Sequence, residues 1–276
     1  MTVIAIAVGA LGALIGSFLN VVVYRVPRGK SIVSPPSACG SCGHVVRGYD
    51  NIPLVSWLVL RGKCRDCSSA ISVRYPLVEL AGAVFFVVVA VRFAPALTGP
   101  DAIGMLAGGI LALVAFLYLA AITIALALID IDTHRLPNVI VLPAYAVGAV
   151  LLGGSSIIDG DIASLGRAAI GAGITGGAYL LLAVVRPGGM GLGDVKLAGA
   201  LGLFLGWLGW DALAVGFLSG FILGGLFGVA LIVFRGARAK SGIPFGPWML
   251  AGAWLGILGG QPIATAYLSL FGLGGS

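Results

Sequence analysis

Charged residues are scarce in this sequence of 276 residues: Asp, Glu, Lys and Arg make up 9% of it, whereas hydrophobic residues make up 59%. A soluble domain usually carries about 25% charged residues, because its surface must interact with water. The shortage excludes an ordinary water-soluble fold and indicates that lipid surrounds most of the chain. The 45 glycines fit this environment, since glycine lets two membrane helices approach closely.

A basic segment is also missing from the N-terminus, where residues 2–23 form a long apolar run that ends near Asn20. A cleaved signal peptide would start with positive charges and have a shorter apolar core. The run therefore predicts a retained first transmembrane helix.

Apolar runs long enough to cross a bilayer recur along the chain, and a spanning helix needs about 20 such residues. The predicted spans are residues 2–23, 77–93, 103–129, 137–153, 164–185, 195–210, 212–234 and 245–260. The sixth is short and glycine-rich, and residues 264–276 are expected to form an interfacial piece. The expected fold is an all-α polytopic membrane protein with about eight transmembrane helices, and no internal repeat is evident.

Basic residues are unevenly distributed between the two sides of this topology. Fourteen of the 16 fall on one side, and by the positive-inside rule that side is cytoplasmic. They are Arg25, Arg28, Lys30, Arg47, Arg61, Lys63, Arg65, Arg74, Arg135, Arg186, Lys196, Arg235, Arg238 and Lys240. The other side receives Arg92 and Arg167, with Asp101, Asp159, Asp161 and Asp211. Both chain ends are expected on the opposite side, outside the cytoplasm. The net charge of +6 indicates a membrane surface, not a nucleic-acid partner, because it lies in short loops.

Four cysteines lie in the one sizeable polar segment, so the expected division is a first helix (1–23), a cytoplasmic loop domain (24–76) and a membrane domain (77–276). Cys39 and Cys42 form one C-x2-C pair, Cys64 and Cys67 form another, and 21 residues separate them. This spacing predicts a structural, four-thiolate zinc site. Two disulfides are the alternative, but disulfides are rare in the cytoplasm. His44 is interpreted as a surface residue.

Three acidic positions lie at or near membrane depth, where ionisable groups are costly and are candidates for function. Asp130 follows an apolar run, Asp194 ends a Gly-Leu-Gly-Asp string, and Glu79 begins the second predicted span. Asp130 and Asp194 are both predicted at cytoplasmic helix ends, so helix packing can bring them together. Two carboxylates that share a water divide into one base and one acid, as hydrolysis by an aspartic dyad requires.

Simpler interpretations stay open from the residues alone. Asp194 can cap a helix, Asp130 and Asp132 can be solvated, and Glu79 can anchor the interface or pair with Arg74. Acidic residues in membranes also relay protons in transporters, so composition does not separate a protease from a proton-coupled carrier. A non-catalytic scaffold of a secretion machine is a third hypothesis.

Several strings nevertheless resemble one family, the bacterial type IV prepilin peptidases of the GxGD aspartyl protease class. The resemblance rests on residues 16–22, 24–27, 50–53, 56–58, 62–65, 74–79, 129–130, 134, 137–138, 189–196 and 244–247, together with both cysteine pairs. These strings cover nearly the whole chain in the family's order. Asn138 departs from them, since many relatives have Asp there.

The resemblance implies that Asp130 and Asp194 form the catalytic dyad, with Asp132 as the rival of Asp130. It implies cleavage after Gly in prepilins or pseudopilins that carry a short basic leader and an apolar helix, with membrane lipids as further partners. It also implies N-methylation with S-adenosylmethionine, for which Gly62, Lys63 and Glu79 are the candidate residues. The loop has no Rossmann glycine fingerprint, so methyl transfer rests on the resemblance alone.

Overall fold

The computed structural model describes residues 2–97, 102–186, 189–235 and 244–272, and over these ranges its regular elements are helices and two isolated β-bridges. The chain divides into two compact units: the first holds Met1–Thr98 and Phe116–Ile129, and the second holds Gly99–Ala115 and Asp130–Ser276. Helix α4 (Ala102–Thr133) therefore contributes to both units. The predicted all-helical fold is confirmed.

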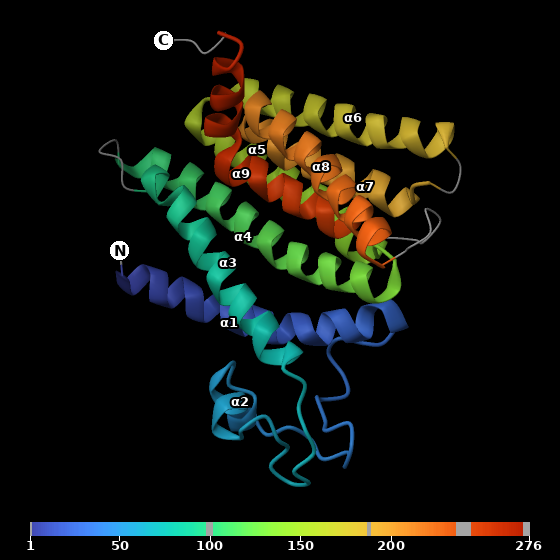
Figure 1. Ribbon diagram of the computed structural model, residues 1–276. Helices are drawn as coiled ribbons and strands as arrows, with labels where there is room; N and C mark the ends of the chain where they lie inside the picture. Colours follow the sequence, from blue (N-terminus) through green and yellow to red (C-terminus); the bar gives the residue numbers. More distant parts are fainter. Residues whose placement is uncertain (1, 98–101, 187–188, 236–243, 273–276) are drawn as a thin grey trace. The chain divides into compact units, whose positions relative to one another are not determined.

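The first unit is built on two long helices that run in opposite directions. These two helices are α1 (Thr2–Arg25) and α3 (Arg74–Leu97) (Figure 1). Between them in the chain lie η1 (Val26–Arg28), η2 (Gly48–Asp50) and α2 (Val55–Val59). Helices α1 and α3 approach closely because glycines face each other: a Cβ atom on Gly12 would overlap the carbonyl group of Gly82. Farther along α3, Phe93 stacks on Phe116 of α4 with 4.5 Å between ring centroids.

The polar segment between α1 and α3 contains two similar turns, one at each cysteine pair. The backbone N–H of Cys39 donates to the carbonyl of His44 over 2.9 Å, and that of Cys64 donates to Ser69 over 2.8 Å. Each turn therefore presents its two cysteines from one short hairpin. The His44 side chain is exposed, as predicted.

Ion pairs connect the flanks of these turns. Arg65 donates to both carboxylate oxygens of Asp50, with distances of 2.6 and 2.9 Å, and Arg47 lies 2.8 Å from Asp66. Hydrogen bonding to Arg65 holds the pKa of the Asp50 carboxyl below its usual range. These bonds help a segment that is too short for a large core of its own.

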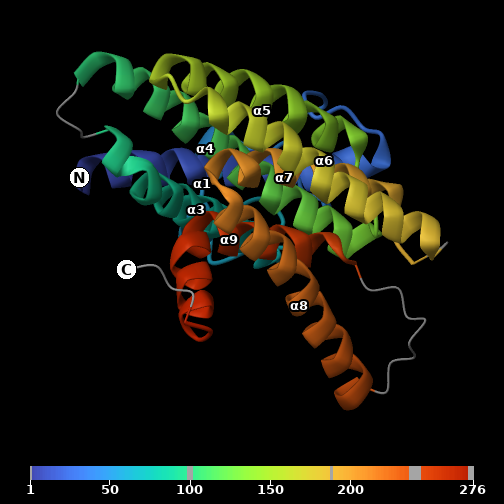
Figure 2. The ribbon, with the colours of Figure 1, turned by 90° about the horizontal axis from the view of Figure 1, so that it is seen from above.

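The second unit surrounds one short central helix. Its helices besides α4 are α5 (Asn138–Asp159), α6 (Ile162–Val185), α7 (Leu192–Leu208), α8 (Trp210–Arg235) and α9 (Gly246–Ser269). Helix α7 packs against the other four, and nine of its 17 residues are buried. Helices α6 and α7 are in backbone contact where Gly171 meets Gly202. Helix α8 packs against α9, and Figure 2 shows its C-terminal end extending beyond the rest of this unit.

Helix α9 continues beyond the predicted end at residue 260. Non-helical dihedral angles at Gly259 produce a kink, and the helix then runs on through Pro262 to Ser269 (Figure 1). Residues 264–269 of the expected interfacial piece therefore belong to α9, and residues 273–276 lie outside the described part.

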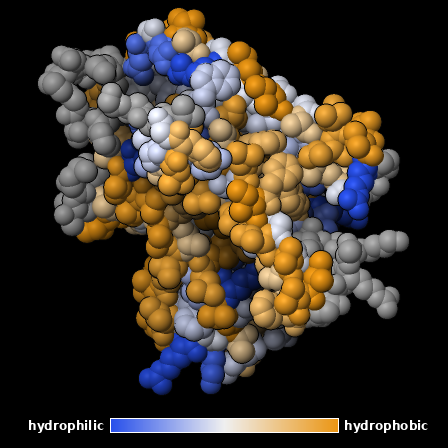
Figure 3. All heavy atoms as spheres, turned by 45° about the horizontal axis from the view of Figure 1, so that its top comes forward, coloured by the Kyte–Doolittle hydropathy of each residue, from blue (hydrophilic) through white to orange (hydrophobic). Residues whose placement is uncertain are grey.

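Six described helices are long and apolar enough to cross a membrane, which makes the chain a multi-pass membrane protein. They span Ala5–Arg28, Arg74–Ala94, Leu106–Thr133, Asn138–Asp159, Ile162–Val185 and Trp210–Phe234. The other two predicted spans are present as helices α7 and α9. Apolar side chains cover most of the described surface that Figure 3 presents. Asp101, Arg238 and Lys240, which contributed to the predicted orientation, lie outside the described residues.

Candidate active site

Asp130 lies near the C-terminal end of α4 and is buried, with 5% of its surface exposed. Its carboxylate Oδ2 accepts a hydrogen bond of 2.9 Å from the backbone N–H of Gly246, the first residue of α9. A carboxylate is unfavourable at a helix C-terminus but favourable at a helix N-terminus, because of the helix dipole. The N-terminus of α9 therefore stabilises the negative charge of the Asp130 carboxylate, which the C-terminus of α4 destabilises.

Gly246 can donate this bond because it has no side chain. A Cβ atom there would lie 2.7 Å from the Asp130 Oδ2 atom and 3.3 Å from Cδ2 of Leu136. The Pro-Phe-Gly-Pro string that contains Gly246 supported the family resemblance, but the sequence assigned it no role. The structure gives it one, namely close approach of a backbone donor to the carboxylate.

Asp194 is the third residue of α7, whose N-cap is Gly191. Its carboxylate Oδ2 accepts a hydrogen bond of 3.0 Å from the Gly191 backbone N–H, so the capping interpretation is correct in part. A carboxylate has about four acceptor positions, and this bond uses one of them. Capping therefore leaves Asp194 able to bind a further group.

The structure places Asp130 and Asp194 in the same unit, Asp130 near the end of α4 and Asp194 in the first turn of α7. Leu136 adjoins both Gly193, the residue before Asp194, and Gly246, the residue that binds Asp130. A Cβ atom on Gly193 would be 3.1 Å from Cβ of Leu136, and one on Gly246 would also meet this side chain. Asp132, the rival of Asp130, is exposed. Leu136 was not identified from the sequence, since an apolar residue in a turn carries no chemical signal.

A second set of contacts positions the start of α7 against α5. The Lys196 ammonium donates to Oδ1 of Asn138 over 3.0 Å, and the Tyr145 hydroxyl donates to the Lys196 carbonyl over 2.7 Å. Asn138 thus keeps the acceptor oxygen that an Asp would supply at this position. These bonds hold the first turn of α7, and with it Asp194.

The four cysteines converge in the loop of the first unit. Their sulfur atoms all lie within 4.8 Å of one another, and those of Cys39 and Cys67 are 3.8 Å apart. In a tetrahedral site with zinc–sulfur bonds of about 2.3 Å, the sulfurs are about 3.8 Å apart, so the cluster fits such an ion. Hydrogen bonding with Ser69 lowers the pKa of the Cys39 thiol, to about 5, and that of the Cys67 thiol, whereas the pKa of the Cys42 thiol is raised to about 12. Cys39 and Cys67 are therefore the two that favour the thiolate, the form that a metal binds.

Structural roles account for two of the three residues that the resemblance connects with methyl transfer. Gly62 has a positive φ of 68°, and a Cβ atom there would lie 2.9 Å from the Trp57 ring. The buried Glu79 carboxylate accepts a hydrogen bond of 2.7 Å from the backbone N–H of Leu54, the residue before α2. Lys63 adjoins Cys64 and forms a β-bridge with Ala70. Gly62 and Glu79 therefore support the loop.

Comparisons with known proteins give a consistent result. The model of the bacterial peptidase A24 N-terminal domain matches residues 10–93, and that of the type IV leader peptidase family matches residues 117–229. A prepilin leader peptidase/N-methyltransferase of Aeromonas salmonicida is 37% identical over 291 residues, which cover 93% of this chain and 91% of the relative. The protein of the same name from Pseudomonas aeruginosa is 36% identical over 290 residues, covering 95% and 92%. No solved structure matches the chain.

Proposed function

This chain belongs to the type IV leader peptidase family, and we propose that it is a membrane aspartyl endopeptidase that uses Asp130 and Asp194 to remove leaders from prepilins. Cleavage takes place at the cytoplasmic face of the inner membrane, after Gly and before the apolar helix of the substrate. N-methylation of the new N-terminus, from S-adenosylmethionine, is the second activity. Neither the relatives nor the family model favours the transporter considered from the sequence.

The chemistry follows from two carboxylates that hold one proton between them. The ionised carboxylate removes a proton from water, and the water oxygen adds to the carbonyl carbon of the scissile peptide. The protonated carboxyl group donates a hydrogen bond to the carbonyl oxygen. Collapse of the tetrahedral intermediate breaks the carbon–nitrogen bond, and the departing nitrogen takes up a proton to leave as an amine.

The hydrogen bond from Gly246 to Asp130 is the observation that carries this proposal. It fixes a buried carboxylate 116 residues away along the chain, in the same unit as Asp194. A side chain that was merely solvated at the end of a helix would be exposed, as that of Asp132 is. Burial and a dedicated backbone donor instead suit an acid with a catalytic role.

Zinc in the four-cysteine cluster is part of the same proposal. Cys39, Cys42, Cys64 and Cys67 supply four thiolates, so the ion would have no open position and would stabilise the loop. The substrate's basic leader and the basic loops of the enzyme repel each other, and anionic head groups offer a surface that attracts both.

Substitution of the carboxylates tests the proposal. Asp130→Asn and Asp194→Asn should each lower the rate of prepilin cleavage at least about a thousandfold, since each removes the acid–base function of one group. The assay uses purified enzyme in lipid vesicles and a model prepilin, with cleavage followed by mass change.

Asp132→Asn is the matched control, because it makes the same change two residues away on an exposed side chain. It should retain cleavage within severalfold of the original enzyme. Normal cleavage by a folded Asp130→Asn or Asp194→Asn variant would remove that residue from the dyad.

A further inference from the structure

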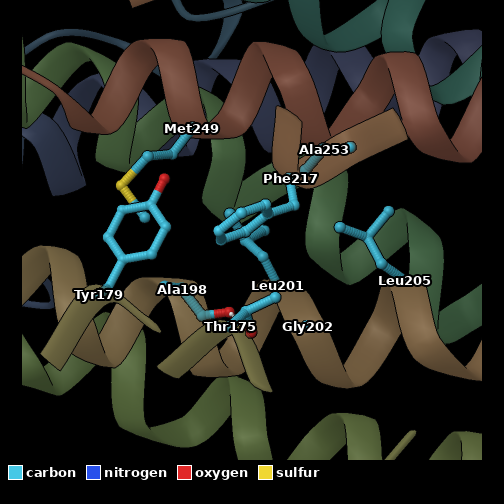
Figure 4. A pocket seen from close by; sticks show the side chains of 10 residues that line it. Thr175, Tyr179, Ala198, Leu201, Gly202, Leu205, Phe217, Met249 and Ala253 are labelled. Carbon is cyan, nitrogen blue, oxygen red and sulfur yellow. Dashed lines mark hydrogen bonds between the residues drawn. The ribbon is translucent and has the colours of Figure 1, made fainter. Parts of the chain in front are cut away.

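Tyr179 on α6 is a buried residue, and 3% of its surface is exposed. No hydrogen bond to its hydroxyl is found within the described part of the chain. Figure 4 shows the side chain leaving its helix with the hydroxyl directed toward Met249, which belongs to α9. Among the described residues, the buried side-chain atom without a hydrogen-bond partner is Nε of Arg167 and not this hydroxyl, so the phenol can still bind a further group.

The packing of α6 against α7 places Tyr179 opposite Asp194. Gly171 faces Gly202, and the Thr175 hydroxyl, four residues later, donates to the carbonyl of Ala198, four residues earlier, over 2.8 Å. One more step of four residues along these antiparallel helices pairs Tyr179 with Asp194. The Asp194 carboxylate is within electrostatic reach of the phenol, as this register requires.

The other side of the ring contacts the residue that leads to Asp130. Tyr179 and Phe245 have ring centroids 6.2 Å apart, and Phe245 immediately precedes Gly246, whose N–H binds Asp130. Phe217 and Phe221 of α8 lie at 5.8 and 5.1 Å from the same ring. These aromatic contacts hold the Tyr179 ring beside Phe245, whose neighbour Gly246 binds Asp130. The register of α6 and α7 places the same ring opposite Asp194.

The cavity beside Tyr179 is small. Its volume is about 20 Å³, and its lining includes Thr175, Phe217 and Met249. That space holds about one water molecule and no amino-acid side chain. The cavity is therefore too small for a substrate side chain, and its lining includes neither Asp130 nor Asp194, so a substrate carbonyl would have to reach the hydroxyl from the side of Asp194.

We propose that the Tyr179 hydroxyl donates a hydrogen bond to the carbonyl oxygen of the scissile peptide during cleavage. This inference rests on the proposed peptidase function. The oxygen gains negative charge when water adds to the carbonyl carbon, so a fixed donor binds the intermediate more tightly than the substrate. The proton stays on the phenol, and no bond to Tyr179 forms or breaks.

Steady-state kinetics of Tyr179→Phe test the proposal. The variant keeps the ring and its aromatic contacts and removes only the hydroxyl. Loss of one such donor should lower kcat about a hundredfold and leave KM within about twofold. Tyr267→Phe is the matched control, since its hydroxyl belongs to an exposed side chain at the end of α9, and it should keep the original kcat.

A binding measurement separates a catalytic contact from a structural one. A peptide with a hydroxyl-bearing tetrahedral carbon at the scissile position should bind Tyr179→Phe about tenfold more weakly. An uncleaved substrate should bind Asp194→Asn equally well with or without Tyr179→Phe. Unchanged kcat and unchanged binding of the mimic, with a lower unfolding temperature, would mean that the hydroxyl serves only to bind a buried water.

The original enzyme and Asp130→Asn are measured beside these variants. Failure of the original enzyme to cleave prepilin would overturn the proposed function. Cleavage that depends on Asp130 but not on the Tyr179 hydroxyl would overturn only the assignment of Tyr179.

Discussion

Gly246 has both an electrostatic and a steric function at the residue scale. Its N–H stabilises the buried Asp130 carboxylate, and its missing side chain makes the approach possible. The helix dipole of α9 adds to the stabilisation, because Gly246 lies at the N-terminus. A residue without a reactive group can therefore be as necessary to the carboxylate as a second acid.

Gly246→Ala should lower prepilin cleavage roughly a hundredfold, because displacement of a reacting group by about 1 Å has an effect of that size. The added methyl group would start 2.7 Å from Oδ2 of Asp130, so one of the two must move. Gly173→Ala is the control, since a Cβ atom at that exposed position of α6 meets nothing within 4 Å. Equal cleavage by both variants would contradict the positioning role.

At the scale of elements, the cysteine-bearing loop depends on tight turns. Gly62→Ala should destabilise the loop by about 1–2 kcal/mol, because Gly62 has a left-handed conformation and the added methyl group would press on the Trp57 ring. The original protein is expected to bind one zinc per chain. The variant should bind less zinc, and proteases should cut its loop faster. Methyl transfer should fall as a result.

Gly48→Ala is the control in the same loop, because a Cβ atom there meets nothing within 4 Å. Prepilin cleavage, measured in parallel, shows whether the membrane helices remain folded. Lost methyl transfer with unchanged zinc content and protease resistance would instead indicate that Gly62 touches the methyl donor.

The sequence predicted the long helices well and their contacts poorly. Lipid imposes about 20 apolar residues on a spanning helix, so the runs mark α1 to α9 apart from the short α2. The predicted span at 245–260 is shorter than the observed helix α9. Glycine and proline usually end a helix, whereas Gly259 and Pro262 lie inside α9, which has a kink at Gly259. The bond between Gly246 and Asp130 was not predictable, since it arises from packing of distant segments. Asp130 and Asp194 themselves stay a prediction until the substitutions are made.

At the scale of the whole molecule, basic residues predict which side of the membrane each turn occupies. The turn between α5 and α6 should lie outside, opposite the cysteine-bearing loop. Ile162→Cys places a thiol on an exposed position at the start of α6, next to this turn. A maleimide that cannot cross membranes should label this variant in intact cells and should not label the original protein, whose cysteines are predicted to face the cytoplasm. Labelling of both proteins, or of neither, would refute the predicted orientation.

The hydrogen bond from Leu54 to Glu79 has a consequence for how this protein can be recombined. Glu79 lies where α3 meets α1, since a Cβ atom on Gly16 would be 2.8 Å from its α-carbon, and its buried carboxylate has the Leu54 N–H as a donor. Deleting or exchanging the loop would leave that carboxylate in apolar surroundings without the Leu54 N–H as its hydrogen-bond donor. The loop is therefore not a portable module, and a viable chimera needs a neutral residue at position 79 or an incoming segment with its own N–H.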